Sequence, residues 1–149
     1  MTAGIYVFFV PGKPMTAGSK RAFAHRHTGR IVVVDDCQGG KVWRKAVAYH
    51  AKTECNHVLT GPLVLEVAFV LKRPLSHRRK DGSTLPGAPR YPIVKPDATK
   101  MLRAVEDALT GIAWIDDAQV VRQVVSKRYA EGLESEGAHV TVYTEVDDG

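Results

Sequence analysis

Residues 63–71, LVLEVAFVL, are apolar at almost every position and constrain the fold more than any other segment. In an extended strand, alternate side chains point to opposite faces. One face would carry Leu63, Leu65, Val67, Phe69 and Leu71, and the other would carry Val64, Glu66, Ala68 and Val70. Because both faces are mostly apolar, we predict a central strand of a sheet.

Shorter periodic segments flank this strand and are separated by long loops at 11–30 and 72–96. Strands are expected over 4–10, 31–36, 118–130 and 137–146, and helices over 40–56 and 98–110. The first strand is expected at an edge because Pro11 follows it, and the last two are expected to form a hairpin. This order predicts an α/β (α+β) fold in one domain over residues 1–149, with a mixed sheet of about five strands and two main helices packed on it.

The positive charge is concentrated in the first two thirds of the chain. Residues 1–96 hold 16 Lys and Arg against 5 Asp and Glu, whereas residues 97–149 hold 5 against 11. A basic region of this kind favours a polyanionic partner, above all nucleic acid, although scattered solvated lysines are the simpler alternative. The long loops carry most of the candidate contacts to DNA phosphates, which are Lys20, Arg21, Arg26, Lys72, Arg73, Arg78, Arg79 and Lys80.

The composition also indicates a cellular compartment. No apolar run approaches the roughly 18–20 residues that a membrane span needs, and the start of the chain lacks a positively charged leader. Cys37 and Cys55 show no CxxC spacing, so we expect reduced thiols in a cytoplasmic protein.

Residues 95–120 concentrate carboxylates in an otherwise basic protein. Asp97, Asp107, Asp116 and Asp117 fall within 21 positions. Carboxylates kept this close often hold a cation, and Mg²⁺ needs only one or two of them plus waters. The alternatives are a helix N-cap for Asp97 and a charged turn for the Asp116–Asp117 pair.

The predicted helix at 98–110 has a polar face opposite its apolar stripe. Asp97, Lys100, Arg103 and Asp107 recur on that face at helical spacing. Arg103 on this face and Lys127 on the following strand are the basic residues that are functional candidates. A solvated face with salt bridges explains the same pattern without any ligand.

The ordered set Pro96-Asp97, Arg103, Asp107-Ala108-Leu109 and Asp116-Asp117-Ala118-Gln119-Val120 resembles the RusA family of Holliday-junction resolvases. More loosely, GKPMTAGSKR, KRPLSH and VSKRYA resemble other parts of that family. One position departs from the family pattern, because Thr99 stands where the family has a second acid. A threonine hydroxyl can ligate Mg²⁺ or a bound water but brings no charge, so Asp116, Asp107 or Glu66 are candidates to replace that acid.

The resemblance implies a metal-dependent endonuclease that acts as a homodimer on branched DNA in a bacterial or phage-infected cell. It implies Mg²⁺, with Mn²⁺ as a substitute, bound by Asp97 and Asp117 with help from Asp116 or Thr99. Arg103 would act on the phosphate, and Lys100 and Lys127 would contact DNA. Two other functions remain open. One is a non-catalytic DNA-binding relative with a degraded metal site, and the other is a less selective phage nuclease acting on flaps or packaging intermediates.

Overall fold

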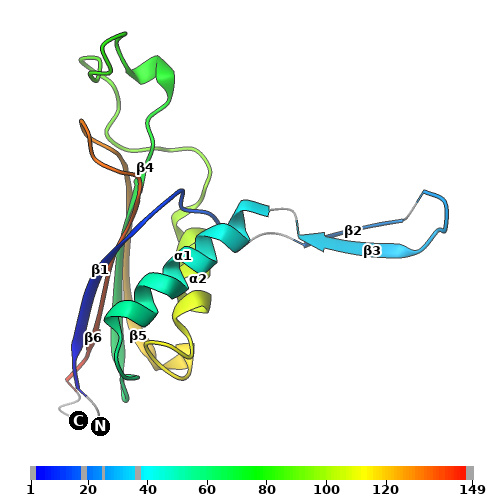
Figure 1. The fold of residues 1–149 in the computed structure, drawn as a ribbon, viewed down its shortest axis with the longest axis vertical. Coiled ribbons are helices and arrows are strands. Elements are labelled where there is room, and N and C mark those ends of the chain that lie inside the picture. Colours follow the sequence, from blue (N-terminus) through cyan, green and yellow to red (C-terminus); the bar gives the residue numbers. More distant parts are fainter. Residues whose placement is uncertain (1–2, 18–19, 25, 36–37, 147–149) are drawn as a thin grey trace.

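The computed structural model describes residues 3–17, 20–24, 26–35 and 38–146 (Figure 1). Its strands are β1 (Ile5–Pro11), β2 (Lys20–Ala24), β3 (Ile31–Asp35), β4 (Leu63–Leu71), β5 (Val120–Tyr129) and β6 (Gly137–Thr144). Its helices are α1 (Gln38–Glu54) and α2 (Ala98–Leu109), with short 3₁₀ turns η1 (Leu75–His77) and η2 (Asp117–Gln119). The predicted class is confirmed, and β2 is the strand that was missed, inside the segment predicted as the first long loop.

The main sheet has four strands in the order β1-β6-β4-β5. The predictions of a central β4 and an edge β1 are confirmed. The sheet is one strand smaller than predicted because β3 pairs with β2 in a separate two-stranded sheet.

The predicted hairpin between β5 and β6 is wrong. β4 lies between these strands, pairing parallel with β5 and antiparallel with β6. A parallel neighbour needs a crossover connection, and α2 supplies it between β4 and β5. The most apolar strand thereby gains hydrogen-bonding partners along both of its edges.

Both helices cover one face of the sheet, and the hydrophobic core lies between them and that face (Figure 1). Trp43 of α1 and Trp114 after α2 are 2% and 0% exposed, so both are core residues. The core also contains Val47, Leu65, Val67, Phe69, Met101, Val105 and Leu109. Because α2 packs through its apolar stripe, its polar face is left toward solvent.

Two segments extend away from this body (Figure 1). The β2–β3 hairpin projects beyond the helices, and the loop between β4 and α2 extends past the end of the sheet. These are the two basic segments predicted from the sequence. Because both segments project from the body of the protein, they are placed to contact a large partner.

Two further observations concern the predicted compartment. Among the described residues, no helix is long and apolar enough to cross a bilayer. Cys55 is a buried free thiol, and burial together with the nearby Glu54 carboxylate raises its pKa to about 11. Cys37 lies outside the described residues.

Candidate active site

Asp97 occupies the N-cap position of α2, but its side chain makes no capping hydrogen bond. Its carboxylate is 55% exposed, and its Oδ2 lies 3.7 Å from Nζ of the exposed Lys100. The capping explanation therefore does not account for this aspartate. Thr99 lies exposed in the first turn of the same helix.

Lys127 of β5 fixes the segment that leads into Asp97. Its Nζ donates hydrogen bonds to the carbonyl oxygens of Val94, at 2.9 Å, and Pro96, at 3.1 Å. The half-buried ammonium group thus uses two of its three donors on the backbone. Lys127, predicted as a DNA contact, thus holds the two carbonyl groups that lie just before Asp97.

Asp116 and Asp117 have different surroundings at the other end of α2. The Asp116 carboxylate accepts a hydrogen bond from Ala118 N at 2.8 Å, as part of a capping box with Gln119. Among the described residues, no hydrogen bond or ion pair engages the exposed Asp117 carboxylate. Asp116 is therefore a structural cap, and Asp117 is free to bind a ligand.

Gln119 holds this turn against the body of the protein. Its Oε1 accepts from the backbone N–H groups of Ile115 and Asp116 at 3.0 and 3.1 Å. Its Nε2 donates to the carbonyls of Leu59 and Gly61, both at 3.1 Å. The glutamine of the Asp-Asp-x-Gln motif thus has a structural role, because it ties the turn to the segment before β4.

Glu106 is a carboxylate that the sequence analysis missed. It is half-buried on α2 and accepts a hydrogen bond from Gln123 Nε2 on β5. Burial raises its pKa, opposed by the Gln123 hydrogen bond; the charges of Asp117 and Asp107 add to the rise, and Arg103 lowers it. Its helical spacing from Thr99 and Arg103 was the available signal, since positions 99, 103 and 106 share one face.

These groups form two separate clusters within one chain. Asp97 and Thr99 lie at the start of α2, while Glu106 and Asp117 lie near its end. A helix of 12 residues separates its two ends by about 18 Å. Among the described residues, no three His, Cys, Asp or Glu side chains gather in a way that could hold a metal ion. The predicted ligands therefore do not meet around one ion in a single chain.

Asp107 and Glu66 were also candidates to replace the acid that the family has at the position of Thr99, and they lie in different places. Asp107 is exposed on α2 beside Glu106. Glu66 lies on the sheet face away from the helices, where Tyr143 Oη donates to it at 3.4 Å. Glu66 therefore cannot join a site on α2.

A profile of the family described as "Endodeoxyribonuclease RusA" matches residues 11–142 of this chain. The chain belongs to the RusA endodeoxyribonuclease family. A curated relative, described as "Uncharacterized protein YqaN" of Bacillus subtilis (strain 168), is 30% identical over 127 residues, which cover 83% of this chain and 87% of the relative. The family match includes both ends of α2, the turn before β5 and the basic loop after β4.

One predicted DNA contact of this RusA-family chain, Arg73, is buried. Arg73 is only 3% exposed and donates to the carbonyls of Ala130 and Pro89 at 2.9 and 2.7 Å. It also pairs with Glu131 Oε1 at 2.6 Å and lies over the Tyr129 ring. Arg73 therefore anchors the loop after β4 and leaves little of its surface for a DNA phosphate.

The other predicted DNA contacts remain on the outside of the RusA-family fold. Lys72, Arg79, Lys80 and Lys100 are exposed, as is Arg26 in the turn between β2 and β3. Arg78 is half-buried and donates to the Gly82 carbonyl at 3.4 Å. Lys20 and Arg21 belong to β2, and their side chains lie outside the described part of the structure.

Proposed function

We propose that this RusA-family protein is a metal-dependent, structure-selective endonuclease that resolves four-way DNA junctions during recombination and repair. The observation that carries this proposal is the family match over residues 11–142, combined with an exposed Asp97 that has no capping role. The protein would act as one domain in the cytoplasm of a bacterial or phage-infected cell.

The separation of the two carboxylate clusters supports a homodimer. In a two-fold dimer, Asp97 and Thr99 of one copy could meet Asp117 and Glu106 of the other, and the reverse pairing would form a second site. Two such sites match the near two-fold symmetry of a four-way junction and allow paired nicks. A carboxylate from the second copy would then supply the charge that Thr99 lacks at the position of the family's second acid.

The residues of this chain would bind and orient the scissile phosphate. Each cluster offers the one or two oxygen ligands that Mg²⁺ commonly takes from protein. A bound Mg²⁺, or Mn²⁺ in its place, would supply charge neutralisation and an activated water. Arg103, exposed on the polar face of α2, would contact the phosphate, and Lys127 would hold Asp97 in position.

Cleavage of a synthetic four-way junction in the presence of Mg²⁺ tests this proposal. We expect the wild type to make paired nicks, and Asp97→Asn or Asp117→Asn to abolish cleavage while keeping or strengthening junction binding, since each removes a negative charge near the phosphates. Glu54→Gln, at the end of α1, is the control for loss of one carboxylate. Wild-type binding without cutting, unchanged by Asp97→Asn, would favour the non-catalytic alternative.

The choice of substrate separates the junction resolvase from a less selective nuclease. Junction, flap, duplex and single-stranded DNA of matched sequence should be compared at equal concentration. A resolvase cuts the junction far faster than the others. Equal cutting of all four would rule out a dedicated resolvase and favour the phage nuclease.

A further inference from the structure

A cavity of about 480 Å³ lies where the loop after β1, the end of β4 and the segment before α2 come together. Its lining includes Lys13, Lys72 and Lys95, together with apolar surface from Leu71 and Val94. Its volume falls within the range of pockets that hold small organic ligands. Neither the family resemblance nor the carboxylate clusters accounts for it.

The chemistry of the lining favours an anionic ligand that also has an apolar, planar part. Among the described residues, no ion pair neutralises Lys13, Lys72 or Lys95, and the lining contains a single carboxylate, that of Glu136. Proline rings and Tyr129 add to the apolar walls. A nucleotide combines a phosphate for the ammonium groups with a base for the apolar walls.

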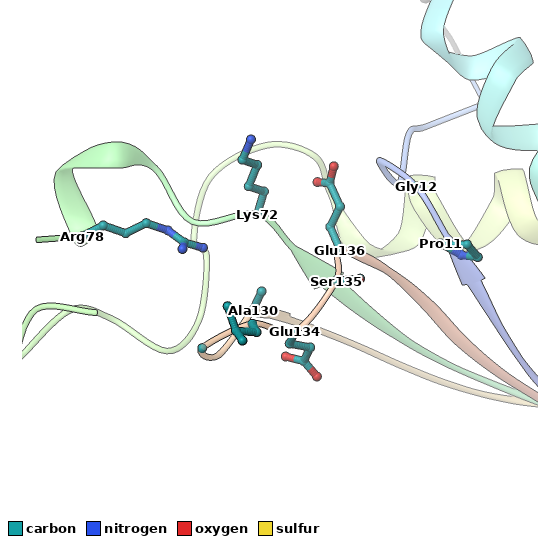
Figure 2. A pocket seen from close by; sticks show the side chains of 10 residues that line it. Pro11, Gly12, Lys72, Arg78, Ala130, Glu134, Ser135 and Glu136 are labelled. Carbon is teal, nitrogen blue, oxygen red and sulfur yellow. The ribbon is translucent and has the colours of Figure 1, made fainter. Parts of the chain in front are cut away.

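The cavity continues in two directions, which favours a polymer over a free mononucleotide. A smaller cavity of about 230 Å³ shares Lys13 and Lys95 with it on the side of Met15. A third cavity, of about 500 Å³, shares Lys72 and Glu136 with it (Figure 2). Figure 2 shows these two side chains above the strand ends and Glu134 pointing the other way. The Glu134 carboxylate forms an ion pair with Arg128. A strand could therefore enter on one side and leave on the other.

The cavity also adjoins the proposed site of cleavage. Pro96 lines it and directly precedes Asp97, and the Lys127 hydrogen bond to the Pro96 carbonyl fixes that wall. Arg73, which also lines the cavity, is itself held by its hydrogen bonds to the carbonyls of Pro89 and Ala130. Because these two parts of the lining are already held, they would need little further ordering when a ligand enters.

We propose that this cavity binds one unpaired nucleotide of the strand being cut, next to the scissile phosphate. The inference rests on the proposed endonuclease function and adds a recognition element to it. A nucleotide at the branch point of a junction leaves its stack at a lower cost than one inside an intact duplex, because stacking is interrupted there. The cavity would thereby favour branched over linear DNA without reading sequence.

Fluorescence of a four-way junction carrying 2-aminopurine at the branch point reports whether a base leaves the stack. In metal-free buffer, we expect wild-type protein to raise the fluorescence and the Lys13→Gln/Lys95→Gln double variant to lose that rise. For a single-stranded oligonucleotide, the logarithm of the association constant falls linearly with the logarithm of the salt concentration. The steepness of that fall should decrease by about 0.7 for each phosphate that the variant no longer neutralises. Lys52→Gln, exposed in the last turn of α1, removes the same kind of charge elsewhere and should change neither value.

A second pair of variants tests the cavity without changing charge. Val94 lines the cavity and is 62% exposed, whereas its neighbour Ile93 is 95% exposed and does not line it. Val94→Trp should abolish the fluorescence rise and weaken junction binding more than duplex binding. Ile93→Trp should do neither.

Three outcomes would overturn the inference. The first is equal loss of duplex and junction affinity in the lysine double variant, which would make these lysines general phosphate contacts. The second is a normal fluorescence rise in Val94→Trp. The third is binding of deoxyadenosine monophosphate that junction DNA fails to displace, which would assign the cavity to a free nucleotide. A wild type that neither binds nor cuts junctions would instead contradict the proposed function, and the single-stranded oligonucleotide still tests the cavity in that case.

Discussion

The Lys127 ammonium group lies 3.1 Å from the carbonyl oxygen of Pro96, the residue directly before Asp97. A side chain from β5 thus determines how the chain enters α2, whose first polar group is the exposed Asp97 carboxylate. This contact joins the sheet to the candidate active site. The position of Asp97 therefore depends on the parallel pairing of β4 with β5.

Lys127→Met should impair cleavage more than it impairs folding. The substitution leaves the Val94 and Pro96 carbonyls without their donor, which should cost about 1–3 kcal/mol of stability. A displacement of Asp97 by about 1 Å would lower cleavage on the order of 100-fold. Lys100→Met removes an exposed cation near the same carboxylate and should have a smaller effect. Urea unfolding and junction cleavage measure the two effects, and full activity of Lys127→Met would contradict the positioning role.

Mixing two inactive variants tests whether each site is shared between two copies. In a heterodimer of Asp97→Asn and Asp117→Asn chains, one site would lose both aspartates and the other would keep both. We therefore expect co-refolded variants to recover single-strand nicking without paired cuts. Each variant refolded alone is the control. If the mixture stays inactive while heterodimers form, Asp97 and Asp117 do not act together across the dimer.

Asp116 and Asp117 should differ in what their loss does to stability. Asp116→Ala removes the cap on Ala118 N and should cost about 0.5–2 kcal/mol. Asp117→Asn breaks no hydrogen bond and relieves repulsion of Glu106, so the free energy of unfolding should stay equal or rise. Chemical denaturation of both variants checks this contrast. Equal destabilisation by the two changes would mean that Asp117 also has a structural role.

Substitution of Arg73 should lower stability, whereas substitution of Arg79 should weaken DNA binding. Arg73→Met breaks four hydrogen bonds of a buried guanidinium and should cost on the order of 3 kcal/mol. Limited proteolysis should then cut the loop at residues 74–96 sooner. Arg79→Met, on the exposed part of that loop, should leave stability unchanged and lower the salt slope of duplex binding by about 0.9. A stable Arg73→Met protein would contradict the anchoring role.

Glu106 predicts a pH dependence of stability with a definite sign. Its pKa is raised above the ordinary value of 4.5, chiefly by burial, so the charged form is disfavoured in the folded protein. Below the ordinary value, wild type and Glu106→Gln should be equally stable. As pH rises through the raised pKa, the variant should become the more stable protein. Denaturation at pH 4 and pH 7.5 measures the free energy of unfolding of the variant minus that of the wild type. We expect this difference to be larger at pH 7.5, and a smaller difference at pH 7.5 than at pH 4 would contradict the prediction.

The local elements followed from local patterns. The apolar side chains on both faces of 63–71 predicted a central strand, and the stripe from Met101 to Leu109 predicted α2 within one residue of its end. These predictions succeed because side-chain period and secondary-structure period must agree wherever a face is buried. β2 was missed because its five residues lie in a segment rich in glycine and basic residues.

The sequence by itself determined which residues form α2 and that β4 is central. It also predicted, through the family resemblance, that Asp97, Asp117 and the basic loops carry the chemistry. Only the tertiary structure decided how these groups are distributed. It inserted β4 between β5 and β6, buried Arg73, made Asp116 a cap, and added Glu106 beside Asp117. The physical reason is that strand pairing, burial and hydrogen bonding depend on segments that are distant in sequence. For the same reason, spacing along the chain could group Asp97 with Asp117 but could not show that a helix of about 18 Å separates them.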